Sequence, residues 1–294
     1  MAGCAATDCG VFIRMRKSNS ANLPARLLVL ALSAMLGLSG CGEADGPPAD
    51  STASFDYPAD LPPACQAVWP AAEPTAARQL YLLRAPANYD PRFAHPLLVV
   101  YPYANATAEQ TERYTRLTLV ATRLGFIVAY PEYRTMGLRN IKAQGGVARD
   151  VAKQRCIDPN RVFMTGHSDG GTVATALALL PESRDGVSGI APSAAGFNKA
   201  DLQTMHCRAR PIPVMVMHGL KDRLFPGWGR EAAGWWAACN TCAAETTAPD
   251  ANGCVTYSGC PEAAPVMYCE GPRGHLAWPG LEAQIVAFLA TAKP

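Results

Sequence analysis

The fold of this protein is decided by the stretch VFMTGHSDGGTVA at residues 162–174. Its apolar start is typical of a short buried strand, and the Ala- and Leu-rich continuation to residue 180 predicts a helix. Between them lies Gly-x-Ser-x-Gly, which in a strand–turn–helix context presents Ser168 as a nucleophile on a sharp turn. The turn brings Gly166 and Gly170 close together, so neither position tolerates a side chain. The alternative is an ordinary glycine turn without a chemical role.

Apolar runs and helical stretches alternate on both sides of this motif. Strands are predicted at residues 79–83, 97–101, 126–130, 187–191, 214–218 and 266–269. Helices are predicted at residues 109–124, 147–154, 230–238 and 281–290, with a turn at 158–160. Thr107 and Gln110 have the spacing of a capping box at the start of the first helix. The alternation predicts an α/β fold with a mostly parallel, doubly wound sheet and helices on both faces.

Length and composition are those of a globular protein. The 294 residues can bury a sizeable core, and 49% of them are hydrophobic while 17% are charged. The first 40 residues hold four basic residues and one acidic residue, so the rest of the chain carries a formal net charge of −1 rather than +2. Because there is neither a basic excess nor a phosphate-binding glycine loop, we expect no nucleic-acid partner.

Residues 1–41 have the features of an export signal. The basic residues precede an apolar run at 27–38, which is too short to span a bilayer and has the size of a signal-peptide core. Ser39, Gly40 and Cys41 follow this run and resemble the lipobox of bacterial lipoproteins, in which the cysteine is lipidated. We therefore predict lipidation at Cys41 and a membrane anchor. Ordinary cleavage, with Cys41 incidental, is the alternative.

The segment after the signal is a predicted linker. Residues 42–63 are rich in Pro, Ala, Asp and Ser without a periodic apolar pattern, which predicts a flexible tether. The catalytic domain is then expected at residues 64–294. We expect the protein to be exported, either lipid-anchored at the bacterial cell envelope or secreted.

Eight cysteines lie beyond the predicted leader, and an even number in an exported chain predicts disulfides. Their pairing stays open, but five of them crowd into residues 239–269 and predict at least two bridges there. Cys239 and Cys242 also have the C-x-x-C spacing found in redox and zinc sites. The oxidising compartment and the lack of a neighbouring set of ligands in the sequence argue against both. We expect no metal ion.

A serine hydroxyl needs a base to take its proton and an acid to orient that base. Where the nucleophilic serine lies on such a strand–turn–helix motif, its partners come later in the chain: first the acid, then the histidine that acts as base, near the C-terminus. His275 is the only histidine after residue 218, and it lies in GPRGHLAWPG at 271–280, a composition typical of a loop. We therefore predict His275 as the base. A purely structural histidine is the alternative.

Ten carboxylates lie between the serine and this histidine, and Asp222 differs from the others in its position. It directly follows the apolar strand that ends at His218, and the carboxyl ends of such strands carry the chemistry of open α/β sheets. We predict Asp222 as the acid, with a turn or capping role as the alternative. Asp201 and Glu231 are weaker candidates. His218 would precede the acid and is predicted as a buried hydrogen-bonding residue.

These residues carry a family resemblance that covers roughly residues 78–290. The matching residues are DPNRVF at 158–163, GHSDGG at 166–171, His218-Gly219, Asp222 and Pro226, followed by Cys254, Tyr257, Gly259-Cys260, Cys269, Gly274-His275 and Trp278-Pro279-Gly280. In this order they resemble bacterial polyhydroxybutyrate depolymerases and feruloyl esterases. The resemblance implies a secreted serine esterase of the α/β-hydrolase fold, with Ser168 as nucleophile, Asp222 as acid and His275 as base.

The sequence departs from this family in two places. The strand at 97–101 usually runs into a His-Gly pair whose following loop donates an oxyanion amide, but here Pro102 has no N–H to donate. The expected oxyanion donors are the amide of Asp169 and that of Tyr103 or Ala104. Alternatively, the Tyr103 hydroxyl serves, or the tyrosines of this loop merely pack.

The second departure is the pair of residues between His275 and Trp278, where the family usually has one. We predict Trp278 as a substrate-facing wall of the site, although the altered spacing bears on the shape of this loop. Trp228 is a further aromatic candidate, whereas Trp235 and Trp236 lie within a predicted helix and are expected to pack.

The motifs together predict hydrolysis of a carboxylic ester through an acyl-enzyme, without a cofactor. The expected substrates are hydroxycinnamoyl or acetyl esters on plant-polysaccharide fragments, or short polyester oligomers. One alternative is a peptidase or acyltransferase on the same fold. The other is a non-catalytic surface lipoprotein, which the altered loop at residues 101–105 would suit.

Overall fold

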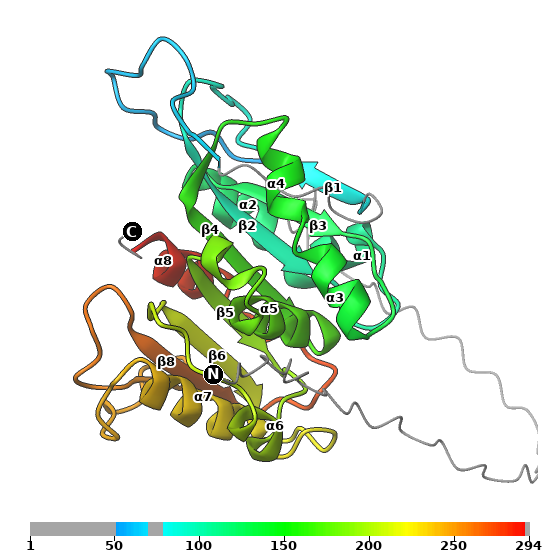
Figure 1. Ribbon diagram of the computed structural model, residues 1–294, viewed down its shortest axis with the longest axis vertical. Coiled ribbons are helices and arrows are strands. Elements are labelled where there is room, and N and C mark those ends of the chain that lie inside the picture. Colours follow the sequence, from blue (N-terminus) through cyan, green and yellow to red (C-terminus); the bar gives the residue numbers. More distant parts are fainter. Residues whose placement is uncertain (1–50, 70–78, 292–294) are drawn as a thin grey trace, which may run out of the picture. The chain divides into compact units, whose positions relative to one another are not determined.

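The computed structural model describes residues 51–69 and 79–291, and it contains a central sheet of eight strands (Figure 1). The strands are β1 (Tyr81–Arg84), β2 (His95–Tyr101), β3 (Ile127–Pro131), β4 (Ile157–His167), β5 (Gly189–Ser193), β6 (Val214–Gly219), β7 (Cys254–Thr256) and β8 (Val266–Gly271). Their order in the sheet is β1-β3-β2-β4-β5-β6-β8-β7. Only the outer pairs β1–β3 and β7–β8 are antiparallel among these strands, so the predicted mostly parallel sheet is confirmed.

Helices cover both faces of the sheet, as the alternating pattern predicted. The first face carries α3 (Leu138–Gln144), α4 (Val147–Ala152), α5 (Asp169–Leu179), α6 (Lys199–Gln203) and α7 (Trp228–Cys239), and the second carries α1 (Ala108–Thr115), α2 (Leu117–Arg123) and α8 (Glu282–Ala290). Alternate residues of β2 point to opposite faces: Leu97 and Val99 join the first core, whereas Leu98 and Val100 join the second. A strand buried on both faces therefore has a continuous apolar sequence.

The predicted helix at 109–124 is two helices. The capping box is present, because the Thr107 side chain accepts from the Gln110 amide and the Gln110 side chain accepts from the Thr107 amide. Arg116 then adopts a left-handed backbone with φ 51 and separates α1 from α2. No glycine or proline marks this break, so the periodic pattern alone could not reveal it.

The predicted turn at 158–160 lies inside β4 as a bulge. His95 of β2 pairs with Ile157, but Leu97, two residues later, pairs with Val162. The extra residues of β4 are held by Asp158, whose carboxylate accepts from the Asn160 amide at 2.9 Å. Short elements such as α3, α6 and β7 were not predicted, because each presents too few apolar residues for a periodic signal.

Part of the predicted tether packs against the domain. The Ala53 amide donates to the Thr122 hydroxyl at 2.9 Å, and the Asn88 side chain exchanges two hydrogen bonds with the backbone of Phe55. The Phe55 ring lies where a side chain on Gly125 would stand. The composition of this segment, rich in Pro, Ala and Asp, did not indicate that Phe55 packs on the domain. The predicted signal peptide and Cys41 lie outside the described residues.

Eight cysteines form four disulfides: Cys65–Cys156, Cys207–Cys239, Cys242–Cys260 and Cys254–Cys269. Two of these bridges lie within residues 239–269, as predicted. The cysteines of the C-x-x-C spacing bond to different partners, which agrees with the expectation that they are not a redox pair. Within residues 51–69 and 79–291, no helix has both the length and the apolar character needed to cross a bilayer.

We expect loss of the Cys254–Cys269 bridge to lower kcat more than loss of the Cys65–Cys156 bridge does, although it should destabilise the fold less. Its 15-residue separation predicts a loss of about 3 kcal/mol on replacement of both cysteines by alanine, against about 4.6 kcal/mol for Cys65–Cys156 with a separation of 91. Because Cys269 lies on β8, just before His275, its removal should nonetheless lower kcat more. Urea unfolding and the hydrolysis rate of a p-nitrophenyl ester, measured on both double variants, test this, and equal losses of kcat would contradict it.

Candidate active site

Ser168 stands on a sharp turn between β4 and α5, with φ 55 and ψ −113. Residues other than glycine avoid this conformation, so neighbouring contacts must hold it. The Ser168 amide donates to the Ser193 carbonyl at 2.9 Å, and the Ser168 carbonyl accepts from both the amide and the hydroxyl of Thr172. A Cβ on Gly166 would lie 2.6 Å from the Gly170 backbone. The structure therefore confirms the prediction that Gly166 and Gly170 have no room for a side chain.

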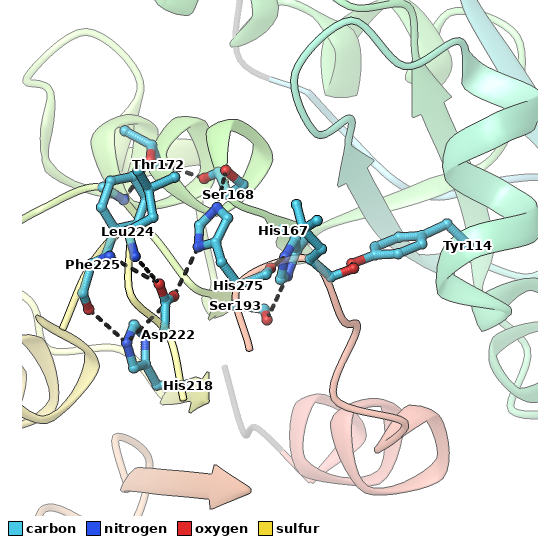
Figure 2. A network of polar contacts seen from close by, with 12 residues as sticks. Tyr114, His167, Ser168, Thr172, Ser193, His218, Asp222, Leu224, Phe225 and His275 are labelled. Atoms are coloured by element: carbon cyan, nitrogen blue, oxygen red, sulfur yellow. Dashed lines mark hydrogen bonds and ion pairs between the residues drawn. The ribbon is translucent and has the colours of Figure 1, made fainter. Parts of the chain in front are cut away.

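The three residues predicted as a catalytic set lie together (Figure 2). Ser168 Oγ is 2.9 Å from His275 Nε2, and His275 Nδ1 is 2.8 Å from Asp222 Oδ2. They follow β4, β8 and β6, so all three lie at the carboxyl edge of the sheet. With Nδ1–H donating to the carboxylate, Nε2 is left to accept the serine proton.

The acid is fixed by its own loop. Asp222 is 3% exposed, and its Oδ1 accepts from the amides of Leu224 and Phe225, both at 2.9 Å. Burial tends to raise the pKa of this carboxyl, but hydrogen bonds from Phe225 and His275 outweigh it and hold the pKa below its usual value. Asp222 is therefore ionised at neutral pH and can stabilise a protonated His275.

His218 is hydrogen-bonded to the loop that holds Asp222, in the buried hydrogen-bonding role predicted for it. Its Nε2–H donates to the Phe225 carbonyl at 2.8 Å, and its side chain is almost fully buried. The next residue, Gly219, lies so close to the histidine loop that a Cβ would stand 2.3 Å from the Arg273 carbonyl. The Lys221 amide donates to this same carbonyl at 3.0 Å. The loops of the acid and the base are thus joined through their backbones.

His167 is a site residue that the sequence reasoning missed. Its Nε2 is 2.6 Å from the His275 carbonyl oxygen, and its Nδ1 is 2.9 Å from Ser193 Oγ. Burial lowers the pKa of His167 to about 4, so the ring is neutral at pH 7. Because a carbonyl can only accept, Nε2 carries the proton and Nδ1 accepts from Ser193. His167 therefore ties the serine turn to the loop that holds the base.

The loop predicted to supply an oxyanion donor lies directly on the start of α5. A Cβ on Gly170 would stand 2.1 Å from the Tyr101 carbonyl oxygen and 2.9 Å from that of Pro102. The Ala106 amide donates to the Tyr103 carbonyl at 3.1 Å, and Asn105 has φ 63, as the third position of a type II turn requires.

The amides of Tyr103 and Ala104 donate no hydrogen bond to another described residue. They remain available beside the amide of Asp169, which begins a helix and has no partner within it. Tyr101 takes the packing role that was one of the alternatives, because it is 1% exposed and its hydroxyl donates to the Gln144 carbonyl.

Trp278 occupies a different position from the one predicted. Its side chain is 7% exposed and belongs to the core of the second face, with its ring near those of Tyr114 and His167. The extra residue before it explains this: Leu276 projects into solvent at 89% exposure and Trp278 turns inward. Trp278 therefore packs beneath the site and does not form an open wall.

Phe225 and Trp228 are the aromatic residues beside the base. The Phe225 ring meets His275 edge to face, with centroids 4.8 Å apart, and stacks on Trp228 at 4.5 Å. Trp236 is 1% exposed and packs in the core, as its helical position predicted. In the part of the chain that the structure describes, no three His, Cys, Asp or Glu side chains are grouped to hold a metal ion.

Solved structures share this arrangement of strands and helices. An acetyl xylan esterase from Aspergillus awamori aligns with a TM-score of 0.58 and 15% identity over 73% of this chain and 99% of its own. The S-formylglutathione hydrolase FrmB from Staphylococcus aureus aligns with a TM-score of 0.52 and 14% identity over 72% of this chain and 92% of its own. The fluorophosphonate-binding serine hydrolase FphF from the same species has a TM-score of 0.51 and 12% identity over 73% and 99%.

The protein therefore has the α/β-hydrolase fold that the sequence predicted. No protein-family model matches the sequence, and no curated protein does. The finer resemblance to polyhydroxybutyrate depolymerases and feruloyl esterases stays a prediction.

The neutral His167 should make folding sensitive to acid. Its pKa is about 4 in the folded protein, against about 6.5 in the unfolded chain, so the unfolded state binds a proton first as the pH falls. The neutral His167 therefore contributes roughly 3 kcal/mol to the free energy of unfolding above about pH 6.5, and this contribution is lost as the pH falls towards 4. Urea unfolding of His167→Gln should show a shallower pH dependence, while variant H206Q at an exposed histidine follows the wild type. Equal slopes in wild type and His167→Gln would contradict this.

Proposed function

We propose that this protein is an exported serine hydrolase that cleaves carboxylic esters through an acyl-enzyme. The observation that carries the proposal is the hydrogen-bonded series from Ser168 Oγ through the His275 ring to the Asp222 carboxylate. It is supported by a buried, ionised acid and by a serine backbone held in the strained turn that such a nucleophile needs.

Each residue has a defined part in the proposed reaction. Ser168 Oγ attacks the ester carbonyl carbon while His275 Nε2 takes the hydroxyl proton, and Asp222 stabilises the resulting imidazolium. The amides of Asp169 and of Tyr103 or Ala104 stabilise the oxyanion. His275 then gives its proton to the departing alkoxide, which leaves as the alcohol. A water molecule, deprotonated by His275, then attacks the acyl carbon; the bond to Ser168 Oγ breaks, His275 returns its proton to Oγ, and the acid leaves.

The substrate is proposed at the level of a class. The motif resemblance favours hydroxycinnamoyl esters, acetyl esters of plant-polysaccharide fragments, or short hydroxybutyrate oligomers. The name of the acetyl xylan esterase agrees with this class, although its likeness to this chain extends only to the fold. Four disulfides are consistent with an extracellular protein. We further propose that Cys41 is lipidated and holds the enzyme at the cell envelope.

The competing functions can be separated experimentally. A peptidase or an acyltransferase would use the same three residues, and product analysis with peptide and alcohol acceptors separates them from an esterase. A binding protein that has lost turnover would leave Ser168 unlabelled by a fluorophosphonate probe. The alignment of Ser168 with His275 favours a reactive serine over this last alternative.

Replacing the members of the series should lower activity by different amounts. Ser168→Ala removes the nucleophile and should abolish hydrolysis of a short p-nitrophenyl ester. Asp222→Asn keeps the shape of the side chain but no longer favours the required histidine tautomer, so kcat should fall by about 10⁴. Asp201→Asn, in the capping box of α6, is the control and should keep wild-type rates, because the amide oxygen can still accept from the Asn198 amide. Equal rates for Ser168→Ala and the wild type would rule out the proposed function.

The second oxyanion donor can be assigned with a variant that keeps the turn. Ala104 is the second residue of the type II turn, where proline is favoured. Ala104→Pro therefore removes only the N–H, and we expect kcat to fall by about 10²–10³. Tyr103→Phe tests the hydroxyl alternative and should have little effect. An unchanged kcat in Ala104→Pro would assign the role to the Tyr103 amide instead.

A further inference from the structure

A carboxylate stands immediately beside the proposed nucleophile. Asp169 is the first residue of α5, and its half-buried side chain accepts a hydrogen bond from the Tyr133 hydroxyl through Oδ2 at 3.0 Å. Its other oxygen, Oδ1, accepts no hydrogen bond from the described residues, and none of their lysine or arginine side chains pairs with it. One acceptor beside Ser168 is therefore left for an external donor.

The sheet order shows on which side of the serine this acceptor lies. Tyr133 follows β3, and Asp169 follows β4, while β2 lies between these two strands. The hydrogen bond between their side chains thus crosses the carboxyl end of β2, where the loop of Pro102 and Tyr103 begins. This loop and the Asp169 amide are the proposed oxyanion donors, so the carboxylate lies at the edge of the oxyanion site.

A negative charge at this place has two chemical consequences. It repels a second negative charge on a bound substrate, and this repulsion is strong where water is partly excluded. It also attracts a hydrogen-bond donor, because an unpaired, half-buried carboxylate oxygen gains more from a donor than a solvated one does. Burial raises the pKa of Asp169 more than the Tyr133 hydrogen bond and the nearby His275 lower it, so these neighbours compensate its charge only in part.

We propose that Asp169 determines specificity, by accepting a hydrogen bond from a hydroxyl group close to the ester carbonyl and by excluding esters that carry a carboxylate there. This inference rests on the proposed esterase function and narrows its substrate class to hydroxylated esters without a negative charge near the ester carbonyl. The hydroxyl can belong to the acyl group or to the alcohol, since both present the same donor. An enzyme site built to pair with a hydroxyl discriminates against the analogue that lacks it.

Matched ester pairs separate these sources. Ethyl 3-hydroxybutyrate against ethyl butyrate tests a hydroxyl on the acyl group, and glycerol monobutyrate against propyl butyrate tests one on the alcohol. Monoethyl succinate against ethyl butyrate tests exclusion of charge. The readout is the ratio of kcat/KM within each pair, for the wild type and for variants D169N and D169L. Tyr133→Phe is the control, because it keeps the carboxylate and removes only its internal partner.

In the wild type we expect a preference of about tenfold for the hydroxylated ester in at least one pair, and a comparable discrimination against the succinate. D169L should bring the kcat/KM ratio of the preferred hydroxyl pair and that of the succinate pair close to one. D169N should relax the discrimination against monoethyl succinate. Tyr133→Phe should keep the hydroxyl preference and the discrimination against succinate. Circular dichroism checks folding, and the isosteric D169N provides the charge test if D169L does not fold.

Ratios that are equal in the wild type and both Asp169 variants would overturn the inference, as would a wild type that shows no preference in any pair. These outcomes leave the proposed function intact, because ethyl butyrate is still hydrolysed in a Ser168-dependent way. Failure of the wild type to hydrolyse any of the esters would overturn the proposed function and this inference together.

Discussion

The positive φ at Ser168 is the constraint on which the rest of the site depends. A serine adopts this conformation only where packing compensates for the strain. Here Gly170 lies against the carbonyl of Tyr101, and the Ser193 carbonyl holds the serine amide. The same contacts bring the β2 loop, the start of α5 and the end of β5 to one point. The proposed oxyanion donors and the nucleophile are therefore placed by a single packing arrangement.

The buried groups of the site differ in charge because their hydrogen-bond partners differ. Asp222 receives two amide donors and a histidine, so it stays ionised although it is almost fully buried. His167 is also buried but faces a carbonyl and a hydroxyl, so it stays neutral. A charged His167 would lie 5.5 Å from the His275 ring and oppose its protonation. The Asp222 charge therefore stands where a proton-accepting base requires it, next to His275 Nδ1.

Sequence patterns were most informative where a residue type has few structural uses. The glycines around Ser168, the apolar strands and the chain order of Ser168, Asp222 and His275 all predicted features that the structure contains. The patterns were least informative where a side chain has many uses. Trp278 was predicted as a substrate-facing wall, but the loop with its additional residue places this side chain in the core. His167 offered no signal, because its partner His275 is distant in the chain and contributes only a backbone carbonyl.

The sequence by itself determined the parallel α/β architecture and the three side chains that lie at one edge of the sheet. Local propensity and chain order are sufficient for this, since parallel strands all end at the same edge. Only the tertiary structure decided the disulfide pairing, the break at Arg116, the packing of Phe55 on the domain and the contact of Tyr133 with Asp169. The break at Arg116 is a local backbone conformation without a glycine or proline to mark it. The other three features depend on contacts between segments far apart in the chain, which no local pattern contains.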